Sequence, residues 1–289
     1  MAHAVPGPAG PPPLGPDGFS WTTWNADPTV VAGLVALGGA YLLAIRHRRR
    51  VAPETAVEPR KMASFAGALL VLFGSLTGPV HDLSDYYLFS AHMVQHMLLV
   101  FAMPPLLLYG TPGWMLGPLL RRPRVARLGR ALTRPSAAFA IFNLVIVAWH
   151  LPPLYNLAMA RHPVHIVEHL MIMAASVILW WPVLSPVSAV PRAPYPIQLL
   201  YLFLVGIPMV MVAIFIAMAD VLLYPYYAAA PRVWPDFTAR ADQLMGGLLM
   251  WIPGGLVFLL VLSVVFFRWQ AAGGDDVALP AVEAPHGGR

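Results

Sequence analysis

The sequence predicts an all-α integral membrane protein that is built as a bundle of seven transmembrane helices. Of its 289 residues, 58% are hydrophobic and only 11% are charged, whereas soluble domains usually carry about 25% charged residues. The mean hydropathy is +0.67, and seven apolar segments approach the roughly 20 residues that are needed to cross a bilayer. Too few polar side chains remain to cover a water-soluble globule.

Proline, glycine and clustered arginine separate the apolar segments. In chain order, the predicted spans are residues 30–45, 62–79, 86–109, 136–150, 163–183, 196–223 and 243–267. We expect the third span to be kinked, because Pro104 and Pro105 donate no backbone hydrogen bond. The membrane domain covers residues 29–268. A flexible Pro/Gly-rich tail is expected over residues 1–28, and a disordered tail over residues 269–289.

The basic residues predict the orientation of the chain. Fifteen of the 18 lysines and arginines fall on one side of the predicted membrane, and only Arg161, Arg232 and Arg240 fall on the other. By the positive-inside rule, the side with 15 is cytoplasmic. The N-terminus is then outside and the C-terminus is inside, as an odd number of spans requires. The net charge of +5 therefore reflects orientation in a membrane, and nucleic-acid binding is not expected.

Histidine is concentrated on the predicted outer side. Eight of the ten histidines fall there, with eight acidic residues. The eight histidines are His3, His81, His92, His96, His150, His162, His165 and His169. A face rich in imidazole and carboxylate attracts and coordinates cations.

Two predicted helices each present histidines on one face. His92 and His96 are four residues apart, which places them about 40° apart on one helix and inside the bilayer. His165 and His169 repeat this spacing on the fifth span, with His162 and Glu168 beside them. An ionisable group at this depth is costly and indicates function. Interhelical hydrogen bonding is the alternative interpretation of such a pair.

The chain has no cysteine, so a soft-metal site must use imidazole, thioether and carboxylate. We predict a metal site formed by His92, His96, His165 and His169. Further groups are expected to admit the metal or to support its ligands: His81, Asp82, His150, His162, Glu168 and Asp242. Copper, most readily Cu(I), fits this ligand set. A haem with two axial histidines also fits, and zinc is possible although it prefers a closed tetrahedral set. Most methionines are expected to be core filler.

Several long motifs resemble those of the CtaG-type cytochrome c oxidase assembly proteins. The segment HMVQHMLL at 92–99, running on to PPLLLYGTP at 104–112, resembles the third-helix motif of that family. Further matches are WHLP at 149–152 with Tyr155, the stretch 165–169 closing at WWP, DQLMGGLLMWIPGG at 242–255, and WNADP at 24–28. The resemblance covers roughly residues 24–268.

The resemblance implies a multi-pass protein of the bacterial plasma membrane that is needed to assemble cytochrome c oxidase through copper delivery. The expected partners are the lipid bilayer, oxidase subunits and an extracytoplasmic copper donor, and no catalytic residue is expected. An unrelated single-span copper chaperone shares the name but works through cysteines, which this chain lacks.

Two other functions remain open from the sequence. One is a bis-histidine haem-binding redox protein of the membrane. The other is a transporter of metal ions or protons, which is disfavoured because the inner halves of the spans hold almost no ionisable residues.

Overall fold

The computed structural model describes residue 14 and residues 18–51 and 57–273, and these residues form helices joined by loops. The predicted tails, residues 1–28 and 269–289, lie mostly outside this part of the chain. The elements are α1 (Pro28–Val51), α2 (Pro59–Leu76), α3 (Gly78–Tyr86), α4 (Phe89–Met97), the π-helix η1 (Leu98–Ala102), α5 (Met103–Gly110), α6 (Gly113–Leu120), α7 (Pro123–Leu132), α8 (Pro135–His150), α9 (Pro152–Ala160), α10 (His162–Leu184), α11 (Tyr195–Met218), α12 (Pro225–Ala229) and α13 (Ala239–Ala271).

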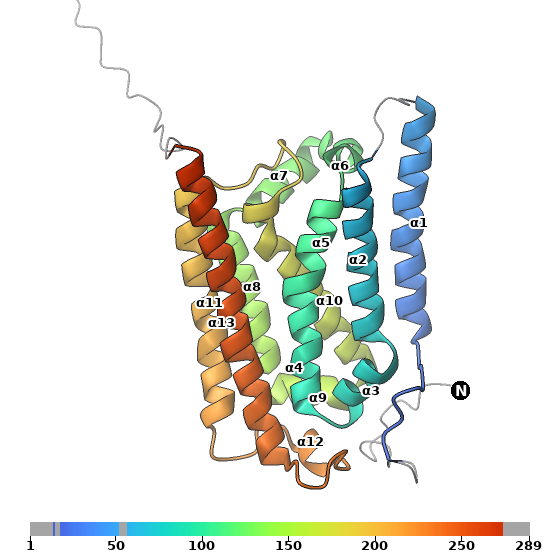
Figure 1. Cartoon of the computed structure of the whole chain (residues 1–289), viewed down its shortest axis with the longest axis vertical. Helices are drawn as coiled ribbons and strands as arrows, with labels where there is room; N and C mark the ends of the chain where they lie inside the picture. Colours follow the sequence, from blue (N-terminus) through green and yellow to red (C-terminus); the bar gives the residue numbers. More distant parts are fainter. Residues whose placement is uncertain (1–13, 15–17, 52–56, 274–289) are drawn as a thin grey trace, which may run out of the picture.

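Five of these helical segments are long and apolar enough to cross a membrane, and the number rises to seven if each of two bent pairs counts as one span. The bent pairs are α2 with α3, at 45°, and α7 with α8, at 69°. The all-α prediction is confirmed, while the count of seven spans and the orientation remain predictions. The arginine-rich α7 lies at the end of the bundle where α1 and α13 end, and α3, α9 and α12 lie at the opposite end (Figure 1).

Two predicted boundaries differ from those of the structure. The sixth span is predicted to end at residue 223, but α11 ends at Met218 and a loop follows it. The last helix continues to Ala271, past the predicted end of the membrane domain. The N-terminal segment packs just before α1: Trp24 stacks on Phe73 with ring centroids 5.4 Å apart.

The kink expected at the two prolines takes the form of the π-helix η1. The amide of Met103 donates to the carbonyl of Leu98, five residues back. Pro104 has no N–H to offer Val100, and the indole Nε1 of Trp180 donates to the Val100 carbonyl instead, at 2.7 Å. Trp180 is itself 2% exposed and lies inside the bundle.

The bundle closes around α4, α8, α10, α11 and α13, which supply the largest hydrophobic core. Helices α11 and α13 lie side by side along much of their length (Figure 1). Glycine allows this approach, because a Cβ on Gly247 would lie 2.7 Å from the backbone nitrogen of Ala217. Small residues serve this purpose between membrane helices in general. Tight packing of α13 also fixes α4, which carries the first pair of histidines.

Candidate metal centre

The structure brings together the four histidines that the sequence predicts as ligands. His92 and His96 lie on α4, and His165 and His169 face them from α10. The imidazole centroid of His92 lies 5.5 Å from that of His165 and 5.8 Å from that of His169. His96 lies 5.4 Å from His169. All four side chains are buried, so they form one cluster inside the bundle.

Within the described residues, two overlapping groups of three ligands have their ligand atoms within 4.8 Å of one another. One group is His92, His165 and His169, and the other is His92, His96 and Glu168. The Nε2 atoms of His92 and His96 are 2.9 Å apart. Two nitrogens that bind one ion at about 2.0 Å each lie about 3 Å apart. The spacing therefore suits either a hydrogen bond or a shared metal ion.

Several polar atoms of this cluster are fully buried and have no hydrogen-bond partner in the described part of the chain. They are His96 Nδ1, His150 Nε2, His165 Nε2, His169 Nε2 and both carboxylate oxygens of Glu168. Leaving one such atom unsatisfied costs about 1–3 kcal/mol. Native proteins keep few of these atoms, and a concentration of them at one place indicates a bound ion or water. The residues present therefore fit a metal ion.

Two of the imidazoles, those of His165 and His150, have a partner on Nδ1, and their Nε2 atoms have no hydrogen-bond partner among the described residues. His165 Nδ1 lies 3.4 Å from the carboxylate Oδ2 of Asp85. His150 Nδ1 lies 2.7 Å from the carbonyl of Ile146, and an N–H donor there fixes the tautomer. A partner on the far ring nitrogen orients a histidine and strengthens it as a ligand. His165 and His150 have this arrangement, with unpartnered Nε2 atoms.

Asp85 supports the cluster although the sequence interpretation did not select it. Its Oδ1 lies 3.4 Å from His81 Nδ1 and its Oδ2 lies 3.4 Å from His165 Nδ1, so it bridges two histidines. The neighbouring Asp82, which was selected, accepts a hydrogen bond from Asn25 at 3.0 Å. The signal for Asp85 was available, because it follows His81 by four residues on one helix.

Tyr227 and Gln95 also support the histidine cluster, although the sequence analysis did not select them. The hydroxyl of Tyr227 donates to the Ser84 carbonyl at 2.5 Å and lies 3.2 Å from His92 Nδ1. Burial raises the pKa of Tyr227 well above its usual value, so the hydroxyl keeps its proton. Gln95 donates to the Ser75 carbonyl at 2.7 Å and accepts from Ser84 Oγ at 3.1 Å. No local sequence pattern places Tyr227, on the short α12, beside α4.

His150 and His162 separate into different roles. Both are predicted to admit the metal or to support its ligands. His150 is 4% exposed and its ring lies 5.8 Å from that of His96, so it belongs to the cluster. His162 instead pairs with Asp27 at 3.0 Å, outside the cluster. Although burial acts to raise it, hydrogen bonds from Thr29 and His162 hold the pKa of Asp27 below its usual value.

Asp242 was predicted to admit or support the metal, and the structure gives its carboxylate a different task. Its oxygens accept hydrogen bonds from the backbone amides of Phe89 and Ser90, at 2.8 and 2.9 Å. These amides begin α4 and would otherwise lack partners. Asp242 therefore caps α4 from the neighbouring α13 and acts on the histidines only by fixing their helix.

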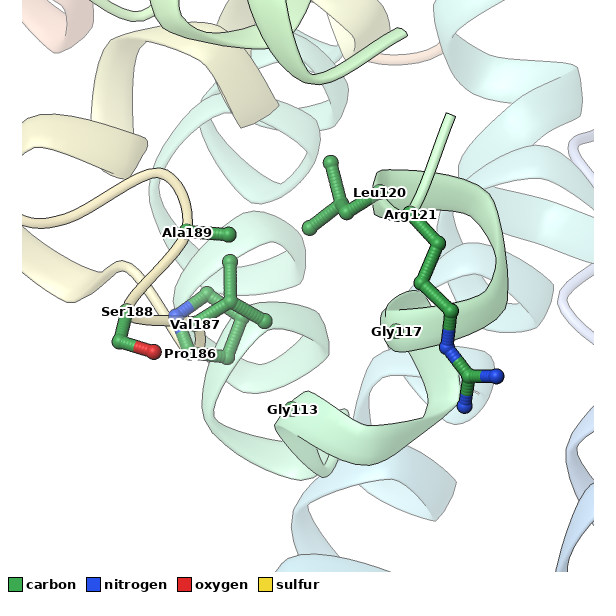
Figure 2. Close-up of a pocket in the computed structure, with 8 residues that line it drawn as sticks. All are labelled: Gly113, Gly117, Leu120, Arg121, Pro186, Val187, Ser188 and Ala189. Atoms are coloured by element: carbon green, nitrogen blue, oxygen red, sulfur yellow. The ribbon is translucent and has the colours of Figure 1, made fainter. Parts of the chain in front are cut away.

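Apart from the histidine cluster, a hollow lies at the opposite, arginine-rich end of the bundle. It has a volume of about 370 Å³ between α6 and the loop 186–189. Figure 2 shows Leu120, the last residue of α6, and Arg121, which follows it, across this hollow from Pro186 and Val187. Its one charged lining residue is Arg121. This lining is no metal-ligand set, and the chemistry of the molecule is concentrated at the histidines.

Comparison with known proteins agrees with this picture. The family model described as cytochrome c oxidase caa3 assembly factor matches residues 39–272. An uncharacterized protein of Mycobacterium leprae (strain TN) is 24% identical over 271 residues, which cover 86% of this chain and 40% of that protein. The chain thus spans less than half the length of this relative. No solved structure matches.

The family match covers the whole histidine cluster, including both helices that carry it and the capping Asp242. It also covers most of the chain, and the resemblance of the helix motifs is thereby confirmed. The chain belongs to the cytochrome c oxidase caa3 assembly factor family.

Proposed function

We propose that this protein binds copper, most readily Cu(I), with His92, His96, His165 and His169, and that it delivers the ion to the metal centre of cytochrome c oxidase. The observation that carries the proposal is the group of buried imidazole nitrogens without partners on two facing helices. The protein acts as a carrier in the bacterial plasma membrane rather than as an enzyme. An extracytoplasmic donor would supply the copper.

The ligand set favours copper among the metals that imidazole binds. Membership of an oxidase assembly family points to a metal that the oxidase needs, and imidazole is a good ligand for copper. Glu168 is the single carboxylate in the two ligand groups. One carboxylate balances the charge of Cu(I) but leaves a divalent ion with an uncompensated buried charge, which is costly.

The buried polar groups above the cluster support loading from the predicted outer end. His81 and Asp85 lie on α3 between that end and His165, to which Asp85 is paired. Toward the other end, Leu99 and Ile172 are both completely buried and close the cluster with hydrocarbon. The path for an ion is therefore polar on one side and apolar on the other. This asymmetry disfavours the transporter alternative.

The haem alternative fits the packing poorly. The ring centroids of His92 and His96 are 4.2 Å apart, and those of His165 and His169 are 4.3 Å apart. Tyr155 packs on His92 with centroids 5.4 Å apart. A porphyrin would have to separate rings that are already in contact. A Soret band in the purified protein would revive this alternative.

The decisive experiment for the proposal is the metal content of oxidase from a strain that lacks this protein. We expect the purified oxidase to retain haem and to lose most of its copper, and the wild-type gene to restore it. A gene that encodes His92→Ala together with His96→Ala should not restore it. Oxidase with full copper in the deletion strain would refute the proposed function.

A further inference from the structure

An apolar groove runs along the side of the bundle beneath α1. It has a volume of about 510 Å³ and is lined by α1, α2, α5 and α10. Apart from Thr29 and His169, all of its lining residues are apolar or glycine. Figure 1 shows α1 at the edge of the bundle beside α2. The groove therefore lies at the depth of the hydrocarbon core and not in water.

His169 belongs both to the metal-ligand cluster and to the wall of this groove. The side chain is 7% exposed, and its Nε2 has no hydrogen-bond partner in the described residues. By the rise of an α-helix, it lies about 10 Å below the first residue of α10. A single imidazole thus separates the cluster from a space that membrane hydrocarbon can reach.

Helix α1 is attached to the bundle just before its first residue and again from Tyr41 onward, and it packs loosely between these two points. At the outer end, the Gly78 amide donates to the Asn25 carbonyl at 2.9 Å, beside the pair of Asp27 and His162. Past the middle of α1, Tyr41 stacks on Phe65 with centroids 3.7 Å apart, and Ile45 one turn further on is also buried. Only 11% of the apolar stretch of α1 is buried in the molecule, compared with 50% for α10.

Gly33 lies in the loosely packed part of α1. It lines the groove, and a Cβ added there would meet nothing within 4 Å. The space beneath α1 can therefore accept side chains from outside the molecule without moving the core. The other walls of the cluster offer no such space, because Phe89, Tyr155 and Leu99 are each at most 1% exposed.

We propose that this groove is the exit for the metal ion, and that the transmembrane segment of the oxidase subunit that receives the ion docks in it. The proposal rests on the proposed function. The occupant must be apolar, because the groove is, and it must carry an imidazole or thioether to take the ion from His169. Membership of the oxidase assembly family supplies the partner of that chemistry.

The transfer is a ligand exchange. The bond from the ion to His169 breaks as a bond to the incoming side chain forms, and the remaining ligands are exchanged in turn. Cu(I) keeps its oxidation state throughout, and each histidine regains the lone pair that it had before loading. No co-reactant is required.

A matched pair of glycine substitutions on α1 tests the groove. Gly33→Phe fills it, whereas Gly39→Phe places the same side chain on the same helix at a position that also has open space but does not line the groove. Each full-length variant is expressed in a strain that lacks the native gene. Two quantities are then measured: Cu(I) bound by the purified variant, and copper in oxidase purified from the same cells.

We expect both variants to bind as much Cu(I) as the wild type, and oxidase copper to fall at least fivefold with Gly33→Phe alone. Equal amounts of copper in oxidase from the two strains would overturn the proposal that the groove is the exit for the ion. Loss of Cu(I) binding by Gly33→Phe would also overturn it, because the groove would then serve to hold the ion. Absence of Cu(I) binding by the wild type would instead refute the proposed function.

A second pair keeps the test decisive if Gly33→Phe does not accumulate in the membrane. Ala174→Phe fills the groove from α10, and Met171→Phe is its control on the exposed face of the same helix. The same two measurements apply. Equal oxidase copper for this pair overturns the proposal.

Discussion

The two halves of α10, named outer and inner after the orientation that the sequence predicts, differ in how their polar atoms are satisfied. In the inner half, Ser176 donates to the Ile172 carbonyl at 2.7 Å, and Trp180 and Trp181 each donate to a carbonyl. In the outer half, Glu168 and His169 keep buried polar atoms without hydrogen-bond partners in the described chain. The polar atoms in the inner half of α10 are therefore paired within the protein, whereas those in the outer half are available to a ligand.

This contrast shows how to separate function from packing in a membrane bundle. A buried polar group that serves only the fold finds a partner, because an unpaired one is costly. Groups that keep unpaired atoms at one place are retained for a ligand that supplies the missing bonds. The following predictions test whether the two halves differ in this way.

The largest effect is expected from removing the carboxylate that orients two histidines. Asp85→Ala should weaken Cu(I) binding about 10- to 100-fold, the usual effect of losing a carboxylate behind a ligating histidine. Competition with a chelator of known affinity measures this change. Asp220→Ala is the control, because that carboxylate is exposed. Equal affinities for the two variants would show that Asp85 does not position His165.

A smaller and opposite effect is expected on the stability of the metal-free protein. His169→Leu removes an unsatisfied buried nitrogen and should raise the free energy of unfolding by about 1–2 kcal/mol, while Cu(I) binding falls. His162→Leu should lower it, because His162 is paired with Asp27. Thermal unfolding in detergent compares the two variants. If His169→Leu proved destabilising, the imidazole would have a structural role.

The smallest effect is expected at the start of α1, at a residue outside the metal-ligand groups. Asp27 accepts hydrogen bonds from the amide and hydroxyl of Thr29, so Asp27→Ala should cost about 1 kcal/mol at pH 7, as for other helix caps. Because the pKa of Asp27 is lowered in the folded protein, this contribution is present above about pH 4. It is lost as the pH falls through the folded pKa.

Unfolding measured at pH 7, 5 and 3 tests the cap. The difference between wild type and Asp27→Ala should be the same at pH 7 and 5 and smaller at pH 3. A difference that grows toward acid would show that the protonated carboxyl is the stabilising form.

The histidine pairs were predictable from the sequence because helix periodicity is local. Spacings of four residues place His92 with His96 and His165 with His169 whatever the bundle does. That α4 faces α10 depends on packing between distant segments, and no local pattern gives it. For the same reason Tyr227 was missed, since its contact with His92 joins residues 135 positions apart.

The positions of His150 and Asp242 show a second limit of the sequence. His150, at the end of α8, is only 4% exposed, and the hydroxyl of Tyr224 donates to its carbonyl at 2.9 Å. An aspartate at the start of α13 was interpreted as a metal-supporting group, but it caps a neighbouring helix. In both cases the surroundings of the residue are set by contacts with segments distant in the sequence, which hydropathy alone does not place.

The central claim is that the four clustered imidazoles hold copper, and Cu(I) loading of the purified protein tests it most directly. Metal analysis after loading and removal of free ion should show bound copper in the wild type and in Ser176→Ala, which changes only the inner half of α10. The double variant His92→Ala, His96→Ala should retain less than a tenth of that copper. Unchanged copper in the double variant would contradict the account.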